Sequence, residues 1–194
     1  MHFKSLLTFT VLMAITLILG GCFAPQTYIK PPTAYAPTAL KTPQPVVVTL
    51  IYEVNGRREQ DKEVALGQWF ANSLEATGVF KPVSSYTTEK NTGEIDIAVN
   101  DVTSGVGGAF LVGLTWGVAG NKATDDMQVS FSYKNPYGLP LVQKYGDPVF
   151  SFQGNATVPA GLMSEPDGQH AITQILRDDV NHFAQQWEQS NRLD

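Results

Sequence analysis

The sequence is poor in the residues that form disulfides, hold metals or bind nucleic acids. Its 194 residues include one cysteine and three histidines, and a single cysteine excludes an internal disulfide. There are 13 basic and 18 acidic residues, so the formal net charge is −5. The basic residues form no cluster, which argues against nucleic-acid binding because that function needs a positive footprint.

Motifs of common catalytic and metal sites are missing as well. The chain has no HExxH, CxxC or G-x-S-x-G pattern, and we predict no catalytic residue, no metal site and no cofactor. His170 and His182 are twelve positions apart, which is about 18 Å along one helix. They are too distant to share a metal ion, and we expect solvated or capping histidines.

Three pairs of acids are candidates for acid/base chemistry: Asp125-Asp126, Asp178-Asp179, and Asp96 with Asp101. Adjacent acids on a strand or helix are expected to point in different directions. We therefore predict that none forms the facing carboxylate pair of a glycosidase.

The amino terminus has the three parts of a signal peptide. Lys4 supplies a positive start, an apolar run extends from Leu6 to Leu19, and Gly20-Gly21 follow it. A membrane-spanning helix needs about 20 apolar residues, and this run is shorter. We expect cleavage between Gly21 and Cys22; an uncleaved amino-terminal anchor is the alternative.

Leu19-Gly20-Gly21-Cys22 resembles the lipobox of bacterial lipoproteins. The resemblance implies that the Cys22 thiol receives diacylglycerol and that Cys22 becomes the new amino terminus. The chain's single cysteine stands at the last position of the motif, which explains an odd cysteine in an exported protein. In this family an aspartate after the cysteine signals inner-membrane retention. Phe23 stands there, so the resemblance implies a lipid anchor in the outer membrane, on the periplasmic side.

Residues 22–45 have the composition of a linker. Six of the chain's twelve prolines lie between residues 23 and 45. Proline lacks a backbone donor and fixes an extended angle, so we predict a semi-rigid spacer that could reach roughly 70 Å; a ligand for a proline-recognising groove is the alternative. Removal of residues 1–21 takes away Lys4 and no acid, which changes the net charge to −6. The folded domain is expected at residues 46–194.

The start of this domain predicts a strand followed by a helix. Residues 46–52 are β-branched and apolar on both faces, which is typical of a central strand buried on both sides. Asn55-Gly56 predicts a turn. A helix is predicted from Gln60 to Thr77 and ends before Gly78. Its apolar face would consist of Leu66, Phe70, Leu74, Val64 and Trp69.

The rest of the chain predicts further strands and a second helix. The strands are expected at residues 79–83, 94–102, 127–133, 139–145 and 149–152, and Pro82 suggests a sheet edge. The second helix, at residues 169–189, would bury Ile172, Ile175, Leu176, Val180, Phe183 and Trp187. We predict an α+β fold class: a two-layer domain with a mostly antiparallel sheet and two helices on one face.

The segment from Ala76 to Val83 resembles a helix–strand junction of periplasmic domains similar to the amino-terminal domain of the Tol translocation protein. Related folds occur in small outer-membrane lipoproteins. The resemblance implies a periplasmic α+β domain, and it assigns no functional residue.

Residues 105–120 carry no charge, and six of the sixteen are glycine. One interpretation is a loop or hairpin that buries its apolar side chains in the core. Another is an exposed patch that docks on a partner, on a second copy of the chain or on the membrane surface. A membrane hairpin would need strands of about 9–11 residues. The candidate interaction patch consists of Phe110, Leu111, Leu114 and Trp116.

These features predict a non-enzymatic, outer-membrane-anchored periplasmic lipoprotein. It would contact the membrane through lipid on Cys22 and act as a binding or adaptor module for another cell-envelope protein. The alternative is an oligomeric subunit of an envelope pore or secretion assembly that uses residues 105–120. An envelope hydrolase would need a site assembled from residues far apart in the sequence.

Overall fold

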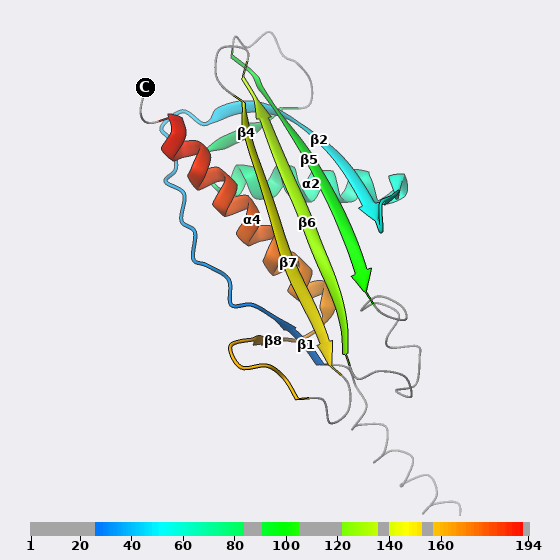
Figure 1. The fold of residues 1–194 in the computed structure, drawn as a ribbon. Coiled ribbons are helices and arrows are strands. Elements are labelled where there is room, and N and C mark those ends of the chain that lie inside the picture. The colour runs from blue at the N-terminus through cyan, green and yellow to red at the C-terminus, as the bar shows by residue number, and fades with distance from the viewer. Residues whose placement is uncertain (1–25, 84–90, 105–121, 136–139, 153–156, 192–194) are drawn as a thin grey trace, which may run out of the picture.

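The computed structural model describes residues 26–83, 91–104, 122–135, 140–152 and 157–191. These residues form one sheet and two helices (Figure 1). The strands are β1 (Gln26–Ile29), β2 (Gln44–Val54), β3 (Arg57–Arg58), β4 (Phe80–Pro82), β5 (Gly93–Ser104), β6 (Lys122–Lys134), β7 (Leu141–Phe152) and β8 (Met163–Glu165). The helices are α2 (Gln60–Ala76) and α4 (Gly168–Asn191). Neither helix has the length and apolar character needed to cross a bilayer.

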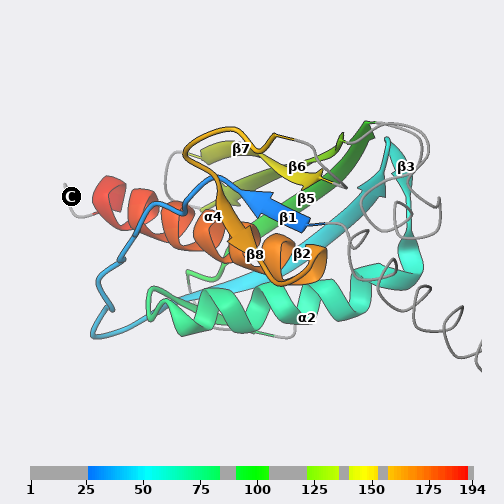
Figure 2. The same cartoon turned by 90° about the horizontal axis from the view of Figure 1, so that it is seen from below.

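The molecule has two layers, a twisted sheet and a layer of helices. Both helices lie on the same face of the sheet and leave the other face uncovered (Figures 1 and 2). The strand order is β3-β2-β5-β6-β7-β1-β8, and β4 also pairs with β2. Only the pairs β2–β5 and β2–β4 are parallel among the described strands. The predicted α+β class, with a mostly antiparallel sheet and two helices on one face, is therefore confirmed.

The core fills the space between the sheet and the helices. In β5 the buried Ile95, Ile97 and Val99 alternate with residues on the uncovered face, as expected for a strand with period two. Aromatic rings join the layers: the centroid of Phe183 on α4 lies 4.8 Å from that of Phe131 on β6 and 5.8 Å from that of Phe80 on β4. Burial of apolar surface, including that of these rings, stabilises the fold by about 25 cal/mol per Å².

Two predictions of burial are wrong. The run at residues 46–52 was expected to be buried on both sides of the sheet, but Ile51 is 42% exposed. Helices cover only one face of β2, so alternate residues face the open side. Val64 was expected on the apolar face of α2, but it is 82% exposed.

Strand β7 is longer than expected. The predicted strands at residues 139–145 and 149–152 are one continuous strand that runs through Pro148, which is paired in register with Asp126 of β6. On its other edge, β7 pairs with β1 at Phe150–Phe152. No strand of the described chain covers residues 141–149 on that side, and proline is tolerated there because it lacks the donor that a second neighbour would need.

The proline-rich segment differs most from its prediction. Residues 22–45 were expected to be a spacer, but Gln26–Ile29 form β1 between β7 and β8. Thr27 and Ile29 are buried, and this alternation falls between Pro25 and Pro31. Residues 30–40 then follow α4 (Figure 1). Backbone N–H groups of this segment donate to two acids of α4, Thr33 to Asp178 and Thr38 to Glu188.

Candidate functional site

The residues that the sequence singled out lie outside the described part of the chain. They are Gly21 and Cys22 at the predicted cleavage site and Phe110, Leu111, Leu114 and Trp116 of the candidate patch. Their roles stay predictions. Among the described residues, no three His, Cys, Asp or Glu side chains are grouped so that they could hold a metal ion.

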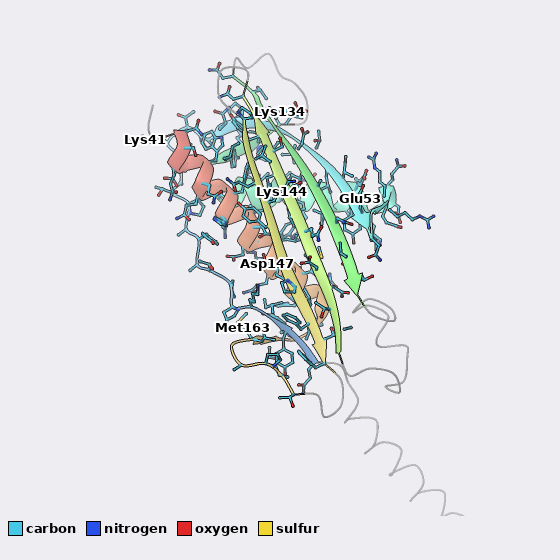
Figure 3. All side chains as sticks on the ribbon, in the orientation of Figure 1. Lys41, Glu53, Lys134, Lys144, Asp147 and Met163 are labelled. Carbon is cyan, nitrogen blue, oxygen red and sulfur yellow. The ribbon has the colours of Figure 1, made fainter. Side chains whose placement is uncertain are left out.

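A pocket of about 350 Å³ lies at the uncovered edge of β7, between that strand, α4 and residues 29–35. It forms because Pro31 and Pro32 follow β1 directly and the chain leaves the edge of β7 there. Exposed residues form the rim, including Lys30 and Lys144. Figure 3 marks Lys144 and Asp147 on β7. Tyr145 and Asp147 are on the helix-facing side of β7, whereas Lys144 is on the open side.

Three carboxylates line this acidic pocket. Asp178 and Asp179 come from α4 and Asp147 comes from β7. Asp179 is only 4% exposed, and its Oδ2 atom is buried without a hydrogen-bond partner in the described chain. Burial, followed by the charges of Asp147 and Asp178, raises the pKa of Asp179 to about 8. Asp178 accepts a hydrogen bond of 3.1 Å from the N–H of Thr33, yet burial raises its pKa too.

Aromatic rings form the other part of the lining. Tyr35 stacks on His182 with the ring centroids 3.8 Å apart, and the ring of Tyr145 lies 4.9 Å from His182. The Tyr145 hydroxyl is buried without a partner in the described chain, and burial raises its pKa. Burial lowers the pKa of His182 more than the neighbouring acids raise it. The imidazole is therefore neutral near pH 7, and its Nε2 atom lies 2.8 Å from Nε2 of Gln186.

This arrangement suits recognition of a positively charged group. Carboxylates accept charge-assisted hydrogen bonds, and the faces of aromatic rings attract organic cations. The neutral imidazole of His182 could accept a proton, but Tyr35 covers one face of the ring and one ring nitrogen contacts Gln186. The geometry favours binding over proton transfer.

From the sequence, Asp178 and Asp179 were one of three candidate acid pairs, and we predicted that their side chains point in different directions. On α4 both acids line the same pocket, and the charge of Asp178 contributes to the raised pKa of Asp179. Asp125 and Asp126 do lie on opposite faces of β6, and Asp96 pairs with Lys134 on the uncovered face. Local sequence patterns could not predict this pocket, because Tyr35, Asp147 and Asp179 belong to three segments that are far apart in the sequence.

A second hollow, an apolar groove of about 490 Å³, lies between α2 and α4. Leu66 and Trp69 of α2, Ile172 and Leu176 of α4, and Met127 of β6 contribute to its lining. All of these residues except Met127 were predicted to face the core. The two helices diverge over this part of the sheet and leave the groove between them.

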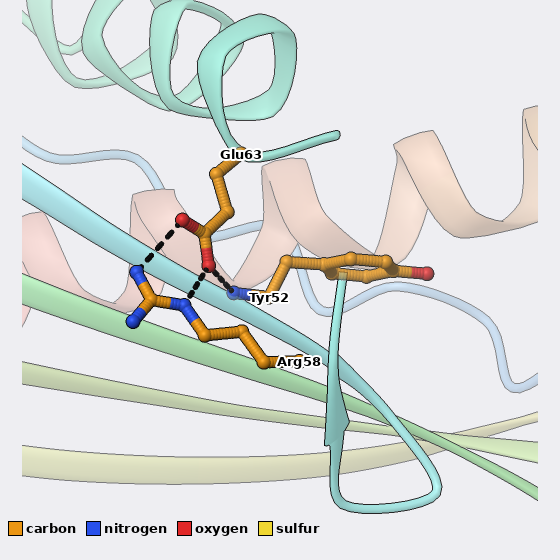
Figure 4. A network of polar contacts seen from close by, with 3 residues as sticks. All are labelled: Tyr52, Arg58 and Glu63. Atoms are coloured by element: carbon orange, nitrogen blue, oxygen red, sulfur yellow. Dashed lines mark hydrogen bonds and ion pairs between the residues drawn. The ribbon is translucent and has the colours of Figure 1, made fainter. Parts of the chain in front are cut away.

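Polar contacts fix one end of this groove. The guanidinium of Arg58 donates to both carboxylate oxygens of Glu63, at 2.7 and 2.9 Å, and the backbone N–H of Tyr52 also donates to Glu63 (Figure 4). The contacts join the β2–β3 hairpin to the first turn of α2. Nearby, burial and the charge of Asp125 raise the pKa of Asp101 to about 6. We interpret the contacts of Arg58, Glu63 and Tyr52 as structural because these three groups are paired with one another.

Solved structures with a similar course of the chain include three bacterial proteins. Rare lipoprotein B from Shewanella oneidensis aligns with a TM-score of 0.40 and 10% identity over 76% of this chain and 96% of its own. A dodecameric PelC variant from Paraburkholderia phytofirmans aligns with a TM-score of 0.38 and 14% identity, and the alignment covers 84% of this chain and 97% of the PelC chain. A putative neuraminyllactose-binding hemagglutinin homolog from Helicobacter pylori aligns with a TM-score of 0.27 and 14% identity, and the alignment covers 75% of this chain and 86% of that protein's chain.

No protein-family model matches the chain, and no curated protein matches it. The structural similarities are too distant to assign a family or an activity, so the functional conclusion depends on the chain's own residues.

Proposed function

We propose that this chain is a lipoprotein anchored in the outer membrane through Cys22, and that its periplasmic domain binds another cell-envelope protein without catalysing a reaction. The observation that carries the binding function is the Oδ2 atom of Asp179, which is buried without a partner in the described chain and belongs to a residue that lines a surface pocket. An unsatisfied buried polar group costs roughly 1–3 kcal/mol of stability. Such groups with shifted pKa values concentrate at functional sites, and a partner that pairs with Asp179 would remove the penalty.

The sheet register supports a direct attachment to the membrane. Gln26, the first residue of β1, pairs with Phe152 at the end of β7. Cys22 precedes Gln26 by four residues, which span at most about 14 Å. We infer that this end of the sheet faces the bilayer and that the domain lies close to it, where the sequence alone had predicted a long spacer.

The acidic pocket would then be accessible from the periplasm. Asp147 precedes Phe152 by five residues on β7, a distance of roughly 17 Å at the rise of a strand. This separation would leave room for a soluble or membrane-anchored partner to reach the pocket.

The candidate patch belongs to the same end of the sheet through its flanking residues. Ser104 pairs with Thr124, and Lys122 pairs with Phe152. Ser104 and Lys122, which flank this segment, therefore lie at the end of the sheet that we assign to the membrane. We propose that Trp116 contributes to docking there, and a Trp116→Asp variant that stays folded and fully functional would refute this role.

Site-specific photo-crosslinking in cells tests the binding function. A photoreactive residue in place of Lys144, at the pocket rim, is expected to give a discrete adduct with one envelope protein. The same residue in place of Glu75, exposed on α2, serves as the control and is expected to give none. The Lys144 adduct should be lost when Asp179→Asn is added. Adducts that are equal at both positions, or unaffected by Asp179→Asn, would contradict the proposal.

Two further measurements test the anchor and the assembly. Mass spectrometry of the mature amino terminus is expected to find lipidated Cys22, and an intact Met1 or an unmodified Cys22 would refute the anchor. The mass of the protein in detergent should correspond to a monomer or dimer. A ring-sized assembly would favour the pore or secretion subunit instead.

A further inference from the structure

We propose that the acidic pocket takes up a single organic cation, the guanidinium or primary ammonium group at the end of an alkyl chain. The proposal rests on the proposed binding function of the pocket and adds the chemistry of the group that is bound.

The first reason is the donor that Asp179 lacks. Its Oδ2 atom is buried and unpartnered in the described chain, in a residue that is 4% exposed and lines the pocket. When Asp179 is ionised its carboxylate only accepts hydrogen bonds, so a donor that carries a positive charge is its complementary partner. Guanidinium and ammonium groups supply several donors and a compensating charge, which makes such hydrogen bonds short and strong.

The second reason is the shape of the lining. The rings of Tyr35, His182 and Tyr145 stand next to one another, and Ile29 and Ile175 also line the pocket. These surfaces suit an alkyl stem, and a ring face attracts the cation at its end. A volume of about 350 Å³ lies at the lower limit of small-ligand pockets, roughly 300–1,000 Å³. It fits a ligand of the size of one side chain.

The third reason concerns the number of charges on the ligand. Asp147 and Asp178 add to the negative charge of the lining, but the exposed Lys30 and Lys144 stand at the rim. A second positive group further along the ligand would meet these lysines. We therefore expect a monocation to bind better than a polyamine.

Direct titration with small probes tests the proposal. The full chain, purified in a non-ionic detergent, is titrated with butylguanidine, butylamine and butylurea by calorimetry. Butylurea has the shape of butylguanidine without its charge. The two cations are expected to bind and butylurea is not. Spermine, a polyamine, is expected to bind no more tightly than butylamine. Absence of cation binding, or equal binding of butylurea, would overturn the proposal.

Two charge-matched variants locate the site. Asp179→Asn removes the unpartnered carboxylate with almost no change of shape, and we expect butylguanidine affinity to fall by about tenfold or more, the loss typical of one charged hydrogen bond. Asp61→Asn removes one negative charge from the exposed first turn of α2 and should leave the affinity unchanged. A similar loss in both variants would show that only the net charge matters. Loss in neither would place the cation elsewhere.

The pH dependence gives an independent readout. Cation binding requires ionised Asp179, so affinity should rise between pH 6 and pH 8 with release of a proton, by up to about tenfold per pH unit. The other titratable groups of the lining are Asp147 and Tyr145 from β7, Asp178 and His182 from α4, and Lys30 and Tyr35 from the amino-terminal segment; Lys144 of β7 is at the rim, on the open side of the sheet. Burial lowers the pKa of His182 below its ordinary value, so its titration would be centred below that of Asp179. A pH-independent affinity would contradict a role for Asp179.

A separate comparison asks whether the cation belongs to a partner protein or to a small molecule. The peptide acetyl-Ala-Arg-Ala-amide and its citrulline analogue are compared with butylguanidine. Tight binding of the arginine peptide would identify a partner side chain, and binding of butylguanidine alone would identify a small molecule. If no probe binds while the Lys144 adduct still depends on Asp179, this inference fails and the proposed function stands. If probes bind but no adduct forms, the proposed function fails instead.

Discussion

The carboxyl group of Asp179 titrates far from its usual range because it is buried beside two other carboxylates. Its pKa rises from the ordinary value of 3.8 to about 8. Below about pH 4, both the folded and the unfolded chain hold the proton. Between pH 4 and pH 8 the unfolded chain releases the proton while the folded chain keeps it. The free energy of unfolding therefore decreases as the pH rises, by at most about 1.4 kcal/mol per pH unit.

An Asp179→Asn variant should lack this loss of stability. We expect the variant and the original chain to have similar free energies of unfolding at pH 4, and the variant to be more stable at pH 8. Urea unfolding at several pH values measures the difference between the two chains, which cancels the contributions of Asp101 and Asp178. Parallel curves for the two chains would show that Asp179 is not the buried, protonated group described above.

At the scale of elements, the two helices and the long strands could be predicted from the sequence because their signals are local. The helix predicted at residues 60–77 is α2 (Gln60–Ala76), and Gly78 follows it with a φ of +70°. The predicted turn at Asn55-Gly56 has positive φ at both residues. These features depend on side-chain periodicity and on glycine's freedom, which a single sequence reveals.

Elements that depend on distant partners could not be predicted in the same way. Strand β1 has four residues between prolines and is defined by pairing with β7 and β8, more than 120 positions away in the sequence. The acidic pocket arises where β1 ends, so it was missed with the strand. The composition of residues 22–45 predicts an extended backbone, but it does not reveal the surface on which the described part of this segment lies.

Gly78 tests whether the amino-terminal segment packs against the turn that follows α2. A β-carbon at Gly78 would lie 2.6 Å from Cβ of Ala39, in addition to the strain of a positive φ. Gly56 has a φ of +74° but no atom within 4 Å of the same position. We expect Gly56→Ala to lower the free energy of unfolding by about 1 kcal/mol, and Gly78→Ala to lower it by about 2 kcal/mol or more because overpacking adds to the strain.

Chemical denaturation of both variants gives this comparison. Adding Ala39→Gly to Gly78→Ala removes the clashing atom and should restore stability to the level of the Gly56→Ala control. Equal effects of the two alanine variants would mean that residue 39 does not contact the turn that follows α2.

At the scale of the whole molecule, the sequence prediction and the structure differ in where the folded domain begins. A mature chain shortened to begin at Val46 would lose β1, the buried side chain of Ile29 and the backbone contacts to Asp178 and Glu188. Burial of Ile29 alone contributes about 1.5–3 kcal/mol. We expect the chain that begins at Val46 to be less stable than one that begins at Phe23 by at least about 3 kcal/mol, as measured by urea unfolding. Equal stability would support the spacer.

If Cys22 is lipidated as proposed, the placement of β1 would also orient the molecule relative to the membrane. In Figure 3 Met163 of β8 lies at the end where β1 begins, whereas Lys41 and Lys134 lie at the other end. Val102 and Glu94 offer a matched pair of probe positions on one strand. Both are on the uncovered face of β5, and they are separated by eight residues, or roughly 26 Å.

Fluorophores on Val102→Cys and Glu94→Cys would report this direction in liposomes that contain nitroxide-labelled lipid. Cys22 is the chain's only cysteine, and its lipidation would leave the introduced thiol as the single site of labelling. Short-range quenching falls steeply with distance from the bilayer, so we expect strong quenching at residue 102 and little at residue 94. The same probes on a Cys22→Ser chain, which cannot be lipidated, control for adsorption. A spacer of roughly 70 Å would leave both probes equally unquenched, and stronger quenching at residue 94 would reverse the proposed orientation.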